Sequence, residues 1–379
     1  MSKSRQTKDG ELILDSHKLS FHMDRIKAWE NGDKIAPVTV DMALTRACGS
    51  MCKFCYATMQ ESQKRFGIKE HHALNLLDDF AEIGVKGVSL VSDGESTLSK
   101  SYATFIEHAS SIGIDTGNAT NGWEFGPEKS ERVLPHLSWL RFTVAAATPE
   151  RYADIMYKGP KHTEVFDKAI RNIKYAVEFK KKHNLSVTLG IQMVLMPEFK
   201  DEIIPFAQLG VDLGVDYAVI KHCSDDENNT LGIDYSQYES MYNLIEAAEN
   251  LSNDVTQVIA KWDKLKDKGE SSYKRFYGPP FLLQISGSGL VAPSGMFFQA
   301  THSKLHIGNF TTDRFRDIYN SDKYWNAMDY LASPNFDAQT MMGTLPIQHY
   351  ISTALDNHLK GIEKIVPATG DNPLHVNFL

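Results

Sequence analysis

The sequence has few cysteines, no surplus of positive charge and no long apolar run. Four cysteines among 379 residues are too few for a disulfide scaffold. The 40 Lys and Arg against 48 Asp and Glu give a net charge of -8, which argues against a sequence-independent grip on nucleic-acid backbones or anionic membranes. No apolar run reaches the roughly 18 residues of a membrane span, and the N-terminus lacks the apolar stretch of a signal peptide. We therefore expect a cytoplasmic protein with no membrane partner, and we do not expect nucleic acid as its substrate.

The remaining composition suits a large α/β fold. With 42% hydrophobic, 10% aromatic and 23% charged residues, the chain can bury a sizeable core. Six short apolar runs alternate with amphipathic stretches, which is typical of successive βα units. Strands are predicted at 38–44, 87–91, 114–119, 139–145, 186–195 and 217–222, with helices at 72–83, 102–112 and 165–182. These units predict a partial (β/α)6 TIM-type barrel whose ligands bind at the carboxyl ends of the strands.

Beyond residue 223 the pattern changes. A polar loop is followed by a predicted helix at 237–251, and we interpret the lysine-rich stretch 261–268 as a solvent-exposed face. Glycine-punctuated hairpin strands are predicted from residue 278 and a helix at 313–330. The chain is therefore expected to divide into an N-terminal extension (1–37), a barrel core (38–223), a helical linker (224–275) and a small α+β C-terminal domain (276–379).

Three of the four cysteines lie together at the end of the first predicted strand. Cys48, Cys52 and Cys55 follow the spacing Cys-x3-Cys-x2-Cys. Soft thiolate ligands suit iron–sulfur clusters, and three of them can bind three irons of a [4Fe–4S] cube. The fourth iron would then be open to a small molecule. A zinc site and three structural thiols are the alternatives, although no matching Cys or His pair accompanies the motif.

This motif resembles the cysteine motif of the radical S-adenosylmethionine (radical SAM) superfamily, and the resemblance extends to the next strands. The segment 92–98, SDGESTL, is similar to the family's GGEPTL turn, with Asp93 and Ser96 in place of a glycine and the proline. The segment 119–122, ATNG, and the strand LRFTV at 140–144 also resemble family segments. The resemblance implies that the cofactor is bound by residues after successive strands: Phe54, Asp93, Gly94, Glu95, Asn121, Thr143 and Gln192.

The resemblance also implies a mechanism. S-adenosylmethionine would chelate the open iron, and reductive cleavage would give a 5′-deoxyadenosyl radical that abstracts a hydrogen atom from the substrate. An electron donor such as flavodoxin or ferredoxin would reduce the cluster. The protein's task would be to position the substrate and exclude water.

The fourth cysteine, Cys223, closes the sixth predicted strand. It could be a small buried apolar residue, a hydrogen-atom donor to a substrate radical, a substrate contact or a ligand of a second cluster. The preceding Lys221 and His222 point to opposite sides of the strand, and either could bind an anionic substrate group or be solvated.

The C-terminal region resembles the SPASM/twitch extension of many radical SAM enzymes, but it lacks the cysteines that hold auxiliary clusters there. Ser294 ends the segment GLVAPS at 289–294, where the family has Gly-x4-Cys, and Phe276, Met342 and Pro346 lie near other ligand positions. Without soft ligands an auxiliary cluster cannot be held. We therefore expect one cluster only, and a C-terminal cap in which Phe276, Phe297 and Phe298 are packing residues.

Three hypotheses of function follow. The first is a radical SAM enzyme acting on a small polar substrate (a sugar, aminocyclitol or nucleotide-type molecule) by epimerisation, dehydrogenation or elimination. The second is radical modification of a ribosomal peptide or a protein side chain. The third is a non-catalytic iron–sulfur protein, against which stand the SAM-type turns after three further strands.

Overall fold

The computed structural model describes residues 4–58 and 67–379, and a single ten-stranded sheet dominates it. The first three residues of the predicted N-terminal extension lie outside the described part. The sheet has the order β12-β11-β10-β3-β4-β5-β6-β7-β8-β9, and β3 to β9 are all parallel. None of the described helices is long and apolar enough to cross a lipid bilayer.

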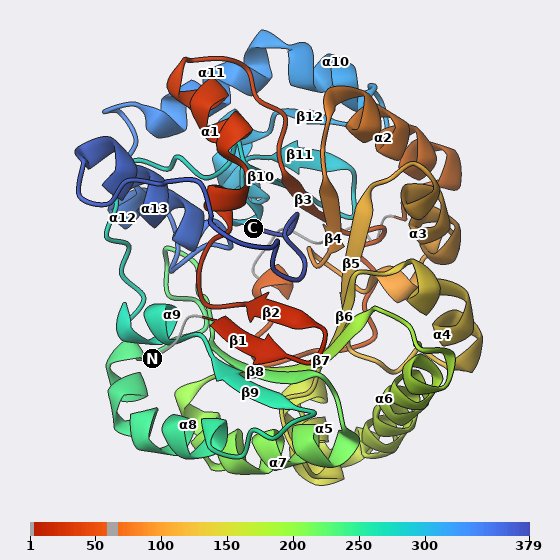
Figure 1. Ribbon diagram of the computed structural model, residues 1–379. Coiled ribbons are helices and arrows are strands. Elements are labelled where there is room, and N and C mark those ends of the chain that lie inside the picture. Colours follow the sequence, from red (N-terminus) through yellow and green to blue (C-terminus); the bar gives the residue numbers. More distant parts are fainter. Residues whose placement is uncertain (1–3, 59–66) are drawn as a thin grey trace.

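The parallel strands and the helices between them form the partial barrel. The strands are β3 (Thr39–Met42), β4 (Gly87–Leu90), β5 (Asp115–Thr120), β6 (Trp139–Thr143), β7 (Thr188–Leu195), β8 (Tyr217–His222) and β9 (Gln257–Ala260). The helices are α2 (Glu70–Ile83), α3 (Tyr102–Ser111), α4 (Pro127–Val133), α5 (Pro149–Tyr157), α6 (Glu164–His183), α7 (Ile203–Leu213) and α8 (Tyr242–Glu249). In Figure 1 these helices surround the strands. The predicted barrel is confirmed, and β9 is a seventh parallel strand that the sequence analysis did not identify.

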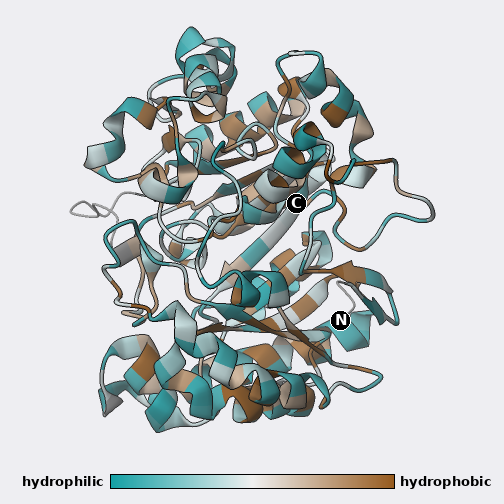
Figure 2. Cartoon of the chain, turned by 90° about the vertical axis from the view of Figure 1, so that its left-hand side faces the viewer, coloured by the Kyte–Doolittle hydropathy of each residue, from teal (hydrophilic) through white to brown (hydrophobic). Residues whose placement is uncertain are grey.

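The local sequence explains why these helices form and end where they do. Helix α6 has acidic residues in its first turn and basic residues in its last, which matches the helix dipole. Helix α2 ends at Gly84, whose φ of 96° is the left-handed conformation that glycine adopts without a Cβ clash. The outer helices carry hydrophilic and hydrophobic stretches side by side (Figure 2), as expected for helices with one face on a sheet.

The C-terminal part extends the same sheet. Its elements are β10 (Leu282–Ile285), β11 (Leu290–Ala292), β12 (Gly308–Asn309), α10 (Phe315–Asn320), α11 (Asp322–Ala332), α12 (Ala338–Met341) and α13 (His349–Lys360). Strand β10 pairs in parallel with β3 and antiparallel with β11, so the predicted hairpin is present and is joined to the barrel. The helix predicted at 313–330 is divided into α10 and α11 at Ser321, whose side chain caps α11.

The N-terminal and C-terminal segments cover the opposite end of the barrel from the predicted site. The N-terminal elements are the hairpin β1 (Ser4–Thr7) and β2 (Gly10–Ile13) and helix α1 (Met23–Glu30). The C-terminus lies at the centre of the ring in Figure 1. There the Thr39 hydroxyl donates to the Asn377 carbonyl at 2.8 Å, and Phe378 packs edge-on against Trp139. The barrel is therefore closed at the amino ends of its strands.

Candidate active site

A cavity of about 530 Å³ lies at the carboxyl ends of the barrel strands. This volume falls in the range of roughly 300–1,000 Å³ that is common for small-molecule sites. All ten residues predicted to bind the cluster or the cofactor line it: Cys48, Cys52, Phe54, Cys55, Asp93, Gly94, Glu95, Asn121, Thr143 and Gln192. The topology therefore brings together residues that lie up to about 140 positions apart in the sequence.

The cysteine loop is fixed to its surroundings by backbone hydrogen bonds. The amides of Met51 and Lys53 donate to the last turn of α5, each at 2.9 Å. The side-chain amide of Asn121 donates to Ser50 Oγ at 3.1 Å, which ties the loop to the end of β5. The backbone of the loop is therefore held from two sides by the fold.

Burial keeps the cysteine thiols protonated when no metal is bound. Burial raises the pKa of Cys48 to about 11 and that of Cys52 well above its usual value, and the neighbouring thiols add mutual repulsion. Bound iron would reverse this, because coordination deprotonates a thiol. Among the described residues, no three His, Cys, Asp or Glu side chains are placed to hold a single metal ion. A cube differs from such a site because each thiolate binds a different iron. The three thiols line one cavity, as the ligands of a [4Fe–4S] cluster must.

Glu95 connects the ends of two strands beside the cysteine loop. One carboxylate oxygen accepts from the hydroxyls of Thr97 and Thr120 at 2.7 and 2.9 Å, and the other accepts from the backbone amide of Asn121 at 2.8 Å. Burial raises the pKa of this carboxyl, and these donors oppose the shift. Glu95 thus fixes the turns after β4 and β5 relative to each other.

The turn at Gly94 requires glycine. Its φ is +111°, and a Cβ added there would lie 2.1 Å from the Thr45 carbonyl oxygen. This close approach brings the turn against the strand end that precedes the cysteine loop. A backbone turn of this kind exposes amide and carbonyl groups to the cavity, as the resemblance to the cofactor-binding turn requires.

Asp93, which replaces a glycine of that turn, bonds to the chain itself. Its carboxylate forms an ion pair with Arg46 at 3.0 Å and accepts from the Ser286 hydroxyl and the Gly287 amide, both at 2.7 Å. Ser286 and Gly287 belong to the β10–β11 hairpin. Asp93 lines the cavity, but we interpret it as a positioning residue that connects the turn to the C-terminal part.

Thr143 and Gln192 are paired in register on β6 and β7 and both line the cavity. Gln192 is buried, and its side-chain oxygen has no hydrogen-bond partner in the described part of the chain. An unpaired buried polar atom costs free energy, so its presence on a cavity wall favours a ligand contact.

Cys223 lies beside the cavity rather than on its wall. It is 0% exposed, and its thiol lies 3.8 Å from the Phe54 carbonyl oxygen and 3.5 Å from that of Ser224. It is not among the residues that line the cavity. A hydrogen-atom donor must reach the substrate radical, so the position of Cys223 does not support the predicted donor role and suits a buried packing residue instead.

The sequence analysis missed several polar residues of the cavity floor. Asp41, Arg141 and Gln284 project into it from β3, β6 and β10. Lys264 also lines it, although the lysine-rich stretch 261–268 was expected to be solvent-exposed. That expectation is wrong for Lys264, because the short helix α9 (Trp262–Lys266) buries this side chain and leaves Lys266 exposed. The alternation of strand residues could have identified Arg141, which lies on the same face as Thr143.

The C-terminal part holds a hydrogen-bond network where the related extension would carry cluster cysteines. Ser294 Oγ lies 3.2 Å from Gln284 Oε1 and 3.3 Å from Gln348 Oε1. The Gln348 amide also donates to the carbonyls of Leu282 and Pro293 at 3.0 and 2.9 Å. Beside it, Phe276 and Phe297 pack edge-on with 6.4 Å between ring centroids. Phe276, Phe297 and Phe298 are buried, as predicted for packing residues.

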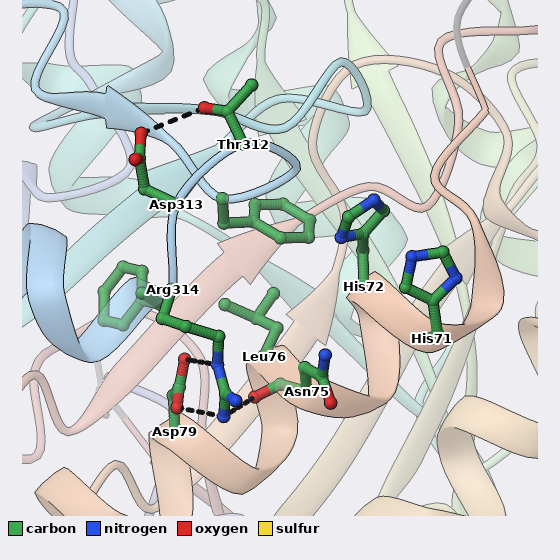
Figure 3. Close-up of a pocket in the computed structure, with 10 residues that line it drawn as sticks. His71, His72, Asn75, Leu76, Asp79, Thr312, Asp313 and Arg314 are labelled. Carbon is green, nitrogen blue, oxygen red and sulfur yellow. Dashed lines mark hydrogen bonds and ion pairs between the residues drawn. The ribbon is translucent and has the colours of Figure 1, made fainter.

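A second cleft, of about 170 Å³, lies between α2 and the segment before α10 (Figure 3). There Arg314 donates to both oxygens of the buried Asp79, at 3.0 and 2.6 Å. His71 and His72 stand at the rim, where Figure 3 shows no hydrogen bond from either ring. The Arg314–Asp79 pair connects the C-terminal part to the barrel, and we assign no chemistry to this cleft.

Comparison with known proteins agrees with this geometry. Residues 42–209 match the family model described as "Radical SAM superfamily". A protein of Flammeovirga pacifica named "S-adenosylmethionine-dependent nucleotide dehydratase" is 26% identical over 118 residues, which are 30% of this chain and 40% of that protein. The chain thus spans less than half the length of this relative.

Two solved structures share the fold. Streptococcus suis SuiB bound to S-adenosylmethionine superposes with a TM-score of 0.62 at 15% identity, covering 80% of this chain and 71% of that one. The protein anSMEcpe with bound AdoMet superposes with a TM-score of 0.54 at 13% identity, covering 87% and 94%. Residues 42–209 therefore form a radical SAM domain, and enzymes of that superfamily use a [4Fe–4S] cluster and S-adenosylmethionine.

Proposed function

We propose that this radical SAM enzyme removes a hydrogen atom from a small polar substrate, a sugar, aminocyclitol or nucleotide-type molecule, in an epimerisation, dehydrogenation or elimination. One observation carries the proposal: the three cysteines and the SAM-type ends of β4, β5, β6 and β7 face one cavity, whose floor continues into polar residues with no role in that motif. A purely structural or redox cluster would not need such a floor.

Most of the work of the chain is positioning. When bound, S-adenosylmethionine at a reduced cluster supplies a radical that takes a hydrogen atom from carbon. Cys48, Cys52 and Cys55 would hold three irons. Glu95 keeps two strand ends in register for the cofactor, and Gln192 offers a free acceptor beside it. These residues are fixed by the fold before any ligand arrives.

The C-terminal part supplies the other wall. Met296 and the segment 345–347 bring apolar side chains to the cavity opposite the strands. Lys264 donates to the carbonyls of Leu345 and Pro346, at 3.5 and 3.0 Å, and so holds this segment in place. An apolar wall excludes water and stray hydrogen donors, which radical chemistry requires. We propose that this part acts as a cap of the SPASM/twitch kind and that the enzyme carries one cluster only.

The nucleotide-type substrate gains support from the matched relative, whose name states nucleotide dehydration. Radical modification of a peptide or protein side chain is the second candidate. A substrate peptide would need a route into the cavity wide enough for its backbone, whereas a small molecule would not. Turnover measured with a set of peptides and with a set of nucleotides and sugar phosphates distinguishes the two candidates, because only the true substrate class should be converted. For both, we propose flavodoxin or ferredoxin as the electron donor.

The test is cofactor cleavage. Protein reconstituted without oxygen should hold about four irons per chain, and with dithionite and S-adenosylmethionine it should form 5′-deoxyadenosine. The Cys52→Ala variant should lose both, whereas Cys223→Ala should keep both. Formation of 5′-deoxyadenosine by the Cys52→Ala variant, or none by the wild type, would overturn the proposal.

A further inference from the structure

The floor of the cavity gathers several basic side chains. Arg141 on β6, Lys221 on β8 and Lys264 on α9 line it, together with the carboxylate of Asp41 on β3. Outside the lining residues, the charge of Lys261 adds to theirs at Lys264, and the carboxylates Asp15 and Asp267 oppose it there. The other carboxylates of the cavity lie at the cysteine end: Asp93 pairs with Arg46, and Glu95 accepts four hydrogen bonds from two threonines and a backbone amide.

These cations lie close to one another. Burial is the main cause that lowers the pKa of Lys221 and of Lys264; the charge of Arg141 adds to it at Lys221, and the charges of Lys261 and Lys221 add to it at Lys264. Like charges gathered in a buried place cost free energy, and a chain keeps them at low cost only when a counter-charge is present or a ligand supplies one.

Two of the three side chains retain donor capacity. Arg141 lies over the Trp139 ring, with 5.4 Å between its guanidinium carbon and the ring centroid. Its guanidinium also bonds to the Tyr217 side chain, whereas its Nε has no hydrogen-bond partner among the described residues. The Lys221 ammonium lines the cavity and forms no hydrogen bond or ion pair with the residues that the structure describes. A guanidinium and an ammonium with free donors suit an oxyanion, because each can donate charge-assisted hydrogen bonds to it.

The position suits a substrate rather than the cofactor. Arg141 lies on the same face of β6 as Thr143 and two residues nearer the closed end of the barrel. Lys221 pairs in register with Val194, one strand beyond Gln192. Arg141 therefore lies below the predicted cofactor position at Thr143, and Lys221 lies one strand beyond the predicted cofactor position at Gln192.

We propose that Arg141 and Lys221, with Lys264 beside them, form an oxyanion subsite, so that the substrate of this enzyme carries a phosphate or carboxylate group. That the bound oxyanion belongs to a substrate rests on the proposed function, whereas binding of an oxyanion at this place does not. Bound there, the oxyanion would fix the substrate with its reacting carbon toward the cysteine end of the cavity. An uncharged sugar would add no counter-charge to that of Asp41.

Calorimetry on the reconstituted enzyme with S-adenosylmethionine present tests the subsite, with inorganic pyrophosphate and malonate as probes. Binding of pyrophosphate, malonate or both is expected, and the tighter probe identifies the phosphate or carboxylate source. Lys221→Gln and Arg141→Gln should each weaken binding by roughly ten- to hundredfold. Lys266→Gln, which removes the same charge from the exposed side of α9, should leave binding unchanged.

No binding of either probe to the wild type, or equal weakening by Lys266→Gln, would overturn the subsite. The two proposals fail separately. An enzyme that forms 5′-deoxyadenosine but binds neither probe keeps the proposed function and loses the subsite. A protein that binds pyrophosphate through Lys221 but cleaves no S-adenosylmethionine keeps the subsite and loses the proposed function. Far-ultraviolet circular dichroism of each variant confirms that it is folded.

Discussion

The barrel cavity and the C-terminal network treat their polar groups in opposite ways. In the cavity, Gln192 Oε1 and Arg141 Nε are buried without a hydrogen-bond partner among the described residues. In the C-terminal part, the Ser294 hydroxyl lies within hydrogen-bond distance of Gln284 Oε1 and Gln348 Oε1, and the Gln348 amide donates to two backbone carbonyls. A polar group left unpaired costs free energy, whereas a satisfied network contributes to stability. Gln284 and Ser294 line the cavity too, so the difference indicates which of its polar groups await a ligand and which are already paired within the chain.

The largest effect is expected from substitution of a predicted cluster ligand. Cys52→Ala should abolish iron binding and 5′-deoxyadenosine formation, because two thiolates on one loop cannot hold the cube. Iron analysis and product chromatography measure both. Cys223→Ala is the matched control, since its thiol is buried outside the cavity. Equal loss of iron in the two variants would contradict our placement of the cluster.

Glu95 tests whether the strand ends must be held together for the cofactor. Glu95→Gln places an amide where four donors converge, so the turns after β4 and β5 should separate. We expect the Kd for S-adenosylmethionine to rise roughly tenfold or more, with iron content retained. Equilibrium dialysis checks this. Glu363→Gln, at an exposed position, is the control. An unchanged Kd for Glu95→Gln would show that Glu95 is not needed to position the turns for the cofactor.

The connection between the two regions is tested at Asp79, which is 1% exposed and accepts twice from Arg314. Asp79→Asn removes the charge that holds Arg314. The free energy of unfolding should fall by about 1–3 kcal/mol, as measured by urea denaturation. Cofactor cleavage at low temperature should be unaffected, because the pair lies in the second cleft and not in the active-site cavity.

The charge of the cavity floor predicts a pH dependence. Burial and the neighbouring Arg141 lower the pKa of Lys221 from 10.5 to about 8, and Cys223 and Asp41 also face it. Lys221 is therefore charged below pH 8 and loses its proton as the pH rises above it. Burial raises the pKa of Asp41 to about 7, so this group gains negative charge over an overlapping range.

Affinity for pyrophosphate should thus fall from pH 6 to pH 9, by about tenfold if one charge-assisted bond is lost. Lys221→Arg should flatten the upper part of this decrease, and an identical profile in that variant would exclude Lys221 as its source.

The smallest effect is expected in the C-terminal network. Ser294→Ala removes one hydroxyl from a network that Gln284 and Gln348 retain in part. The cost should be about 0.5–1.5 kcal/mol in the free energy of unfolding, with the iron content unchanged at about four per chain. A loss of iron in this variant would show that the network region contributes to cluster binding.

The sequence predicted the barrel and the cluster motif because both depend on the spacing of residues that are close together in the sequence. The six predicted strands all form, since β-branched and apolar runs are local signals. The cysteine spacing and the turn at Gly94 are equally local. Strand β9 was missed because it is short and follows a polar linker. The burial of Lys264 was missed because it depends on a partner distant in the sequence, Pro346. The bond of Asp93 to Gly287 could not be predicted for the same reason.

The central claim is that S-adenosylmethionine binds the iron that the three cysteines leave open. Low-temperature electron paramagnetic resonance of the dithionite-reduced protein tests it most directly. We predict a [4Fe–4S]+ signal whose g values shift when S-adenosylmethionine is added. A cluster signal that stays the same on addition of saturating S-adenosylmethionine, with no 5′-deoxyadenosine formed, would contradict the account.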